Sequence, residues 1–169
     1  MIKNIVAHYS FPIGIILILS FSRLIPHPPN VTPVIAIAIM STYFFKNIYI
    51  SILSLVISMI IADLFIGFHT NMIFVYSSLV MIVLIFSMIK KKITFKNLLI
   101  YGFSGSMLFY LISNFGVWLL TGMYSKNFYG LVECYILAIP FLANTIISTI
   151  FFSYAALIAS NFAFKKITQ

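Results

Sequence analysis

Long apolar runs separated by short polar breaks dominate this sequence of 169 residues. Only 7% of the residues are charged and 63% are hydrophobic, whereas a soluble domain carries about 25% charged residues. Such a chain cannot cover itself with a surface compatible with water. A helix needs about 20 apolar residues to cross the hydrocarbon core of a bilayer. The sequence therefore predicts an all-α integral membrane protein, folded as a single bundle of six transmembrane helices.

The whole chain, residues 1–169, is expected to form one transmembrane domain, because its short connections leave no room for another. The expected spans are residues 9–24, 33–45, 48–65, 72–89, 98–120 and 132–162. Four prolines between residues 25 and 33 must interrupt the helix, since proline lacks an N–H and disfavours helical geometry in the preceding residue. Thr32 and Pro33 then predict the N-cap and the first residue of the second span.

The last apolar run is longer than one crossing requires and contains Pro140. Such a run can tilt, kink at the proline or extend beyond the bilayer. The sequence does not decide among these three.

The basic residues predict the orientation of the bundle. Eight fall on the side of the N-terminus, and two fall on the opposite side. The eight are Lys3, Lys46, Lys90, Lys91, Lys92, Lys96, Lys165 and Lys166, and the two are Arg23 and Lys126. Lysine and arginine collect on the cytoplasmic side of membrane proteins. Both termini are therefore expected in the cytoplasm, which also requires an even number of spans.

With this orientation, polar side chains gather in the outer half of the membrane and in the outer loops. Polar groups inside hydrocarbon cost a few kcal/mol each unless they are paired or wetted. Several of them on one side suggest a cavity that opens to that side. The predicted ligand-binding residues are Arg23, His27, Asn30, Asp63, His69, Asn114, Trp118, Glu133, Tyr135 and Asn144.

Each of these residues also has a structural interpretation. Asp63 can reach interfacial water or pair with Arg23. The Glu133 carboxylate can be stabilised by the dipole at the N-terminus of the last helix. Asn144 can hydrogen-bond to a neighbouring helix, and Trp118 can belong to the interfacial aromatic belt. The sequence leaves both readings open.

Other functional classes find little support. Cys134 is the single cysteine, so the chain can form no internal disulfide. The histidines His27 and His69, with Asp63 and Glu133, show no HxxxH or HxH spacing, so no metal site is expected. No GxSxG, HExxH or P-loop motif is present, so we expect neither an enzyme nor a cofactor. The positive charge lies in short flanks, which indicates topology rather than nucleic-acid binding.

Several segments resemble the DUF6580-type family of bacterial membrane proteins described as transport proteins. They are Arg23 with residues 26–33, then 62–69, 113–118, 129–131, 134–135 and 138–141 with Asn144. The chain is also distantly similar to the S components of energy-coupling factor (ECF) vitamin transporters, in its six short helices, the loop after the first and the aspartate that ends the third. It lacks the alanine-rich docking pattern of their first helix.

This resemblance implies an ECF S-component-like fold in a bacterial inner membrane. It also implies a small-molecule ligand in a pocket near the outer face, and coupling and ATPase subunits as partners, since the chain has no nucleotide-binding motif. The predicted function is then a substrate-binding subunit for uptake of a small organic micronutrient, a vitamin or a precursor. Two alternatives remain: a non-catalytic structural scaffold similar to the cell-shape protein MreD, and a self-contained small transporter.

Overall fold

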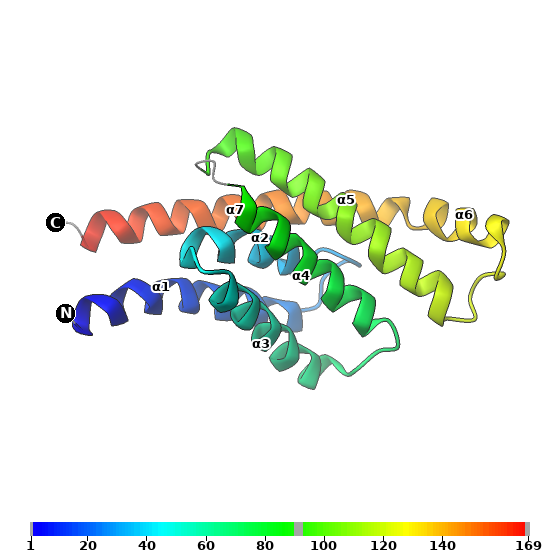
Figure 1. Ribbon diagram of the computed structural model, residues 1–169, viewed down its shortest axis with the longest axis horizontal. Helices are drawn as coiled ribbons and strands as arrows, with labels where there is room; N and C mark the ends of the chain where they lie inside the picture. Colours follow the sequence, from blue (N-terminus) through cyan, green and yellow to red (C-terminus); the bar gives the residue numbers. More distant parts are fainter. Residues whose placement is uncertain (1, 90–92, 168–169) are drawn as a thin grey trace.

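The structure is a computed structural model that describes residues 2–89 and 93–167, with the side chains of 2–9, 11 and 163–167 left out. The described residues form seven α-helices and one short 3₁₀ turn (Figure 1). In chain order these are α1 (Ile2–Phe21), η1 (Ser22–Leu24), α2 (Val34–Phe45), α3 (Ile48–Ile66), α4 (Met72–Met88), α5 (Phe95–Leu120), α6 (Phe128–Leu137) and α7 (Ile139–Ile167).

The predicted all-α class is confirmed, but the last predicted span, 132–162, is two helices rather than one. The break falls at Ala138, whose N–H bonds back to the carbonyl oxygens of Cys134 and Tyr135. Pro140, the second residue of α7, has no N–H to offer, and its ring would collide with the carbonyl four residues earlier. One helix, α6, therefore ends before Ala138, and a new helix, α7, begins after it. In Figure 1, α6 and α7 follow one another in the same direction.

The predicted start of the second span is wrong by one residue. Pro33 occupies the N-cap position of α2, no side chain caps it, and Val34 is the first helical residue. Thr32, predicted as the cap, lies one residue too early to serve. At the other end, Lys46 adopts a left-handed conformation (φ 50°), and Asn47 caps α3 by accepting the N–H groups of Tyr49 and Ile50.

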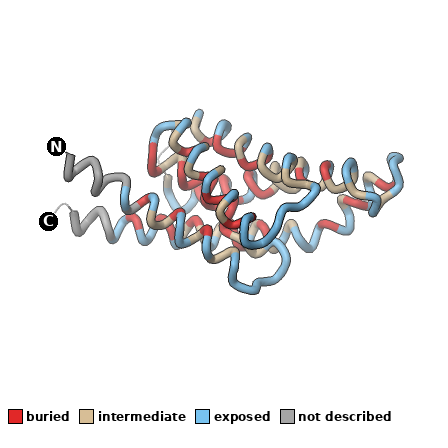
Figure 2. The backbone as a smooth tube through the Cα atoms, turned by 90° about the horizontal axis from the view of Figure 1, so that it is seen from below, coloured by how far each residue is buried: buried red, intermediate tan, exposed pale blue. Residues whose placement is uncertain are grey.

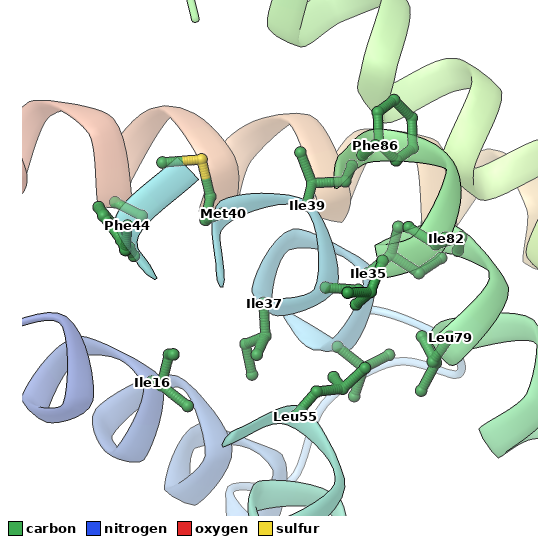
Figure 3. Close-up of a cluster of buried hydrophobic side chains, with 14 of the residues drawn as sticks. Ile16, Ile35, Ile37, Ile39, Met40, Phe44, Leu55, Leu79, Ile82 and Phe86 are labelled. Carbon is green, nitrogen blue, oxygen red and sulfur yellow. The ribbon is translucent and has the colours of Figure 1, made fainter. Parts of the chain in front are cut away.

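The short helix α2 lies at the centre of the bundle. It contacts α1, α3, α4, α5 and α7, and ten of its 12 residues are buried. At 1.5 Å per residue it is only about 18 Å long. A helix that is apolar all round requires neighbours on every side. Its isoleucines pack against Leu55, Leu79, Ile82 and Phe86 of the surrounding helices (Figure 3).

The outer faces of the helices are apolar and exposed, the reverse of a soluble protein. Figure 2 shows exposed residues along the outer sides and buried ones concentrated within the bundle. Leu53 on α3, Phe103 on α5 and Ile147 on α7 are each more than half exposed. Among the described residues, α3, α5 and the stretch Ile139–Phe162 of α7 are long and apolar enough to cross a membrane. The chain is therefore a helical membrane protein in which three of the described helices are long and apolar enough to span a bilayer.

The bundle has two distinct ends. At the terminal end, α1 begins and α7 finishes, beside the tight α2–α3 turn, the end of α4 and the start of α5. At the loop end lie the connections 22–33, 67–71 and 121–127. Figure 1 shows both chain termini at one end, and the loops 67–71 and 121–127 at the other.

Candidate functional site

A buried ion pair joins three elements at the loop end. The Arg23 guanidinium of η1 lies 3.0 Å from the Asp63 carboxylate of α3. The second Asp63 oxygen accepts a 2.7 Å hydrogen bond from the Tyr76 hydroxyl of α4, and Arg23 also contacts the Met59 sulfur. Asp63 is only 1% exposed. Both oxygens of the Asp63 carboxylate thus have partners within the chain. The structural interpretation of Asp63, pairing with Arg23, is confirmed.

The proline-rich connection is tied to α7. The Asn144 side-chain amide donates to the carbonyl oxygen of Pro29 at 3.0 Å, and the Ser148 hydroxyl donates to that of Asn30 at 3.3 Å. Asn30 has a left-handed backbone (φ 62°), which asparagine tolerates better than most residues. The partner of Asn144 is therefore a loop carbonyl and not another helix. His27 is exposed, with a ring nitrogen 2.6 Å from the Ile25 carbonyl oxygen.

Polar side chains between α5 and α6 donate to backbone carbonyl oxygens of these two helices. The Tyr135 hydroxyl donates to the Leu111 carbonyl at 2.6 Å, and the Tyr110 hydroxyl donates to the carbonyl of Tyr135. The two tyrosine rings meet edge to face with centroids 5.5 Å apart. Asn114 donates to the Tyr110 carbonyl at 2.8 Å and receives Cys134 Sγ–H at its own carbonyl. These contacts hold α6 against the C-terminal part of α5.

Trp118 and Lys126 close the end of α5. The Trp118 indole donates to the Ser125 carbonyl at 2.9 Å, and Lys126 donates to the carbonyl oxygens of Trp118, Leu119 and Thr121. The ammonium also lies 5.7 Å from the Trp118 ring centroid. A cation at this position satisfies carbonyls that a helix leaves without partners.

The structural role proposed for Glu133 is wrong. Glu133 lies in the middle of α6, whose first turn contains no acidic residue, so it does not stabilise a helix N-terminus. The misplacement follows from the start of α6 at Phe128, four residues before the predicted span. Glu133 is exposed, as is His69 in the connection 67–71.

Seven of the ten predicted ligand residues therefore fall into four internally bonded groups, and His27, His69 and Glu133 are exposed outside them. None of the ten lines either cavity described below. Ligand binding by these residues stays a prediction. In the part of the chain that the structure describes, no three His, Cys, Asp or Glu side chains lie close enough to hold a metal ion.

A cavity lies at the terminal end, where the sequence predicted no ligand-binding residue. It has a volume of about 710 Å³ and lies beyond the C-terminal part of α2, between α3, α4 and α5. Its lining residues are Ile39, Thr42, Tyr43, Lys46, Asn47, Ile48, Ser51, Phe86, Ser87, Ile89, Ile93 and Tyr101. The available signal was length: a 12-residue α2 cannot fill a bundle whose α5 has 26 residues.

A second, smaller cavity of about 230 Å³ is lined by residues of α1, α2 and α3. Most of its lining residues are apolar, with Ile13, Leu17 and Leu53 among them. Leu17 and Leu53 also belong to the exposed apolar surface. This cavity therefore belongs to the apolar face that the bundle presents to its surroundings.

The fold and its exposed apolar faces define an α-helical membrane protein, and the buried polar ties hold its loops to its helices. Residues 3–169 match DUF6580, a family of unknown function, and the chain belongs to that family. No curated protein and no solved structure matches the chain.

Proposed function

We propose that this protein is a membrane-embedded binding protein for a small organic solute, acting in uptake of a micronutrient such as a vitamin or a precursor. The cavity at the terminal end carries this proposal. Its volume of about 710 Å³ falls within the range of roughly 300–1,000 Å³ that is typical of small-molecule sites. It combines apolar walls with a few polar groups, as such sites do.

In this proposal the chain crosses a bacterial inner membrane six times, through α1, α2, α3, α4, α5 and the α6–α7 pair. Lys46 and Lys96 lie at the terminal end, so the positive-inside rule orients this end toward the cytoplasm. The cavity is then the inward-facing half of the path. The loop-end residues predicted to bind ligand would form the outward-facing half once the ties of Asp63 and Asn144 open.

ATP-driven uptake would require separate coupling and ATPase subunits, because the sequence contains no nucleotide-binding motif. This is the arrangement that the similarity to ECF S components implies. A self-contained transporter would instead move the solute without them. Reconstitution of the purified chain alone in vesicles separates the two, because only the self-contained protein would then transport.

Two serines on α4 offer a matched test of the cavity. Ser87 lines it and Ser77 does not, and each hydroxyl donates to the carbonyl three residues earlier. We expect Ser87→Trp to fill the cavity and abolish solute retention, measured by native mass spectrometry after exposure to vitamin mixtures. Ser77→Trp should retain solute as the unmodified protein does. Equal retention in both variants, with unfolding temperatures unchanged, would overturn the proposal.

A structural scaffold is the second candidate, and the internally bonded loop end favours it. If Asp63 and Asn114 serve only structure, then Asp63→Asn and Asn114→Ala should lower stability and leave any uptake per folded molecule unchanged. If they serve the solute path, both substitutions should abolish uptake. Uptake into cells, normalised to the amount of folded protein in the membrane, distinguishes the two roles.

A further inference from the structure

We infer that the cavity at the terminal end binds an amphipathic organic anion, whose carboxylate or phosphate is held by Lys46 and Tyr101. This inference rests on the proposed function, since it names the chemical class of the solute. It follows from the hydrogen-bonding groups in the cavity wall that have no partner, and from the charge of that wall.

Three hydroxyl groups in the wall already donate within the chain. Thr42 donates to the Ile39 carbonyl at 2.7 Å, Ser51 donates to that of Ser41 at 3.0 Å, and Ser87 donates to that of Leu84 at 2.7 Å. The Asn47 side-chain oxygen caps α3. These three hydroxyl donors and the Asn47 oxygen are therefore already engaged within the chain.

Tyr101 is the exception among the buried members of the wall. It is 8% exposed, and its hydroxyl is a buried polar group without a hydrogen-bond partner. The ring is held against Phe86, with centroids 5.1 Å apart and an angle of 59° between planes. An unpaired buried hydroxyl is costly. A ligand that accepts its proton in a hydrogen bond would remove that cost.

Lys46 brings a positive charge to the same wall. It is exposed at the turn between α2 and α3, and it forms no ion pair among the described residues, where Arg23–Asp63 is the one pair present. No acidic residue lines the cavity. The only two acids of the chain are Asp63, which is paired with Arg23, and Glu133, which lies in α6. The cavity thus presents a cation without an internal counter-charge.

The Tyr101 hydroxyl and the Lys46 ammonium are both donors, so the ligand must offer an acceptor there. The ammonium favours a negatively charged acceptor. The rest of the wall includes Ile39, Ile48, Ile89 and Ile93, which match an apolar body. A carboxylate or phosphate on an apolar body fits these requirements. Such a molecule can be a soluble organic acid or an anionic lipid.

The test uses probe pairs that differ in one charged group. We would measure binding to the purified protein in phosphatidylcholine nanodiscs, using nicotinate against nicotinamide, biotin against biotinamide and pantothenate against panthenol. A second arm compares unfolding temperatures in phosphatidylglycerol and in phosphatidylcholine nanodiscs without any soluble probe. We expect at least tenfold tighter binding of one acid than of its neutral counterpart, or a higher unfolding temperature with phosphatidylglycerol.

Variants assign the effect to the cavity. Lys46→Asn removes the charge and suits the left-handed backbone at this position, and Lys46→Arg keeps the charge. We expect a tenfold or greater loss of acid binding, or loss of the phosphatidylglycerol effect, with Lys46→Asn and a smaller loss with Tyr101→Phe. Lys46→Arg should restore most of the effect. Lys96→Asn, an exposed lysine at the same end and outside the cavity wall, should change nothing.

The outcomes separate this inference from the proposed function. Equal binding of acids and neutral counterparts, still abolished by Ser87→Trp, would overturn the anion and leave solute binding intact. A response to phosphatidylglycerol alone, lost in Lys46→Asn, would support the anion and overturn solute uptake. Equal losses in Lys46→Asn and Lys96→Asn would overturn the assignment to this cavity. No response in either arm would overturn both proposals.

Discussion

The two ends of the bundle use their polar residues in opposite ways. The loop end is rich in ionisable and amide side chains, and its buried charges are bonded to one another, as with Arg23, Asp63 and Tyr76. Its unpartnered buried atoms, Arg23 Nε and Asn71 Oδ1, belong to residues that line neither cavity. The terminal end has fewer such groups, yet Lys46 and Tyr101 face a large cavity with their donors unused. Unused hydrogen-bonding groups beside a cavity are therefore a better guide to a ligand site than the number of polar residues.

The largest expected effect comes from breaking the ion pair at the loop end. Asp63→Ala would leave the Arg23 guanidinium in a partly buried site without its counter-charge, which costs about 3–5 kcal/mol for a buried pair. Glu133→Ala removes the only other acid of the chain from an exposed position and should cost less than about 0.5 kcal/mol. Denaturant-induced unfolding in detergent micelles measures both.

A double variant sharpens this prediction. Arg23→Met combined with Asp63→Leu removes both charges, so it should be more stable than Asp63→Ala alone. If Asp63→Ala unfolds like Glu133→Ala, the pair contributes no stability and the loop end is not held as described. Its polar residues would then be available to a ligand, and the contrast between the ends would fail.

An intermediate effect is expected where α5 passes α4. A Cβ added at Gly116 would collide with the Asn71 side-chain oxygen and the Phe74 ring, whereas one added at Gly122 meets nothing within 4 Å. Overpacking of this kind costs about 1–3 kcal/mol. Gly116→Ala should therefore lower the unfolding temperature and Gly122→Ala should not. Equal unfolding temperatures would show that the loop end is loosely packed.

The smallest effect concerns the proline-rich connection. Asn144→Ala removes the hydrogen bond to the Pro29 carbonyl, worth about 1 kcal/mol, and should speed proteolytic cleavage within residues 25–33. Asn161 lies on the same helix and is exposed, so Asn161→Ala should leave the cleavage rate unchanged. An unchanged rate in Asn144→Ala would mean that Ser148 alone holds the connection.

The helical class and most helix positions follow from the sequence. The predicted spans 33–45, 48–65 and 72–89 differ from α2, α3 and α4 by one residue at a boundary. These agree because proline, Asn47 and Gly67 interrupt apolar runs locally. The division at Ala138 did not follow, since Pro140 in a long apolar run is compatible with a kink, a tilt or a new helix.

The sites were harder to predict because they depend on contacts distant in the sequence. Arg23 and Asp63 were recognised as possible partners, but Tyr76 was not, since nothing in its surroundings distinguishes it from other membrane tyrosines. The cavity at the terminal end was not predicted for a related reason. Among the described residues its wall contains one charged side chain, Lys46, which had been assigned to topology, and the unused hydroxyl of Tyr101 is visible only in three dimensions.

The central position of α2 has a consequence for how this protein is made. A 12-residue segment is too short to be retained in a bilayer by its own hydrophobicity, and α2 has no face that would contact lipid in the finished bundle. We therefore expect it to enter the membrane together with α3, to which the tight Lys46–Asn47 turn joins it, and to be enclosed when the later helices pack around it. Nascent chains that end before α7 would still leave one side of α2 uncovered, which makes synthesis of the last helix the step that completes assembly.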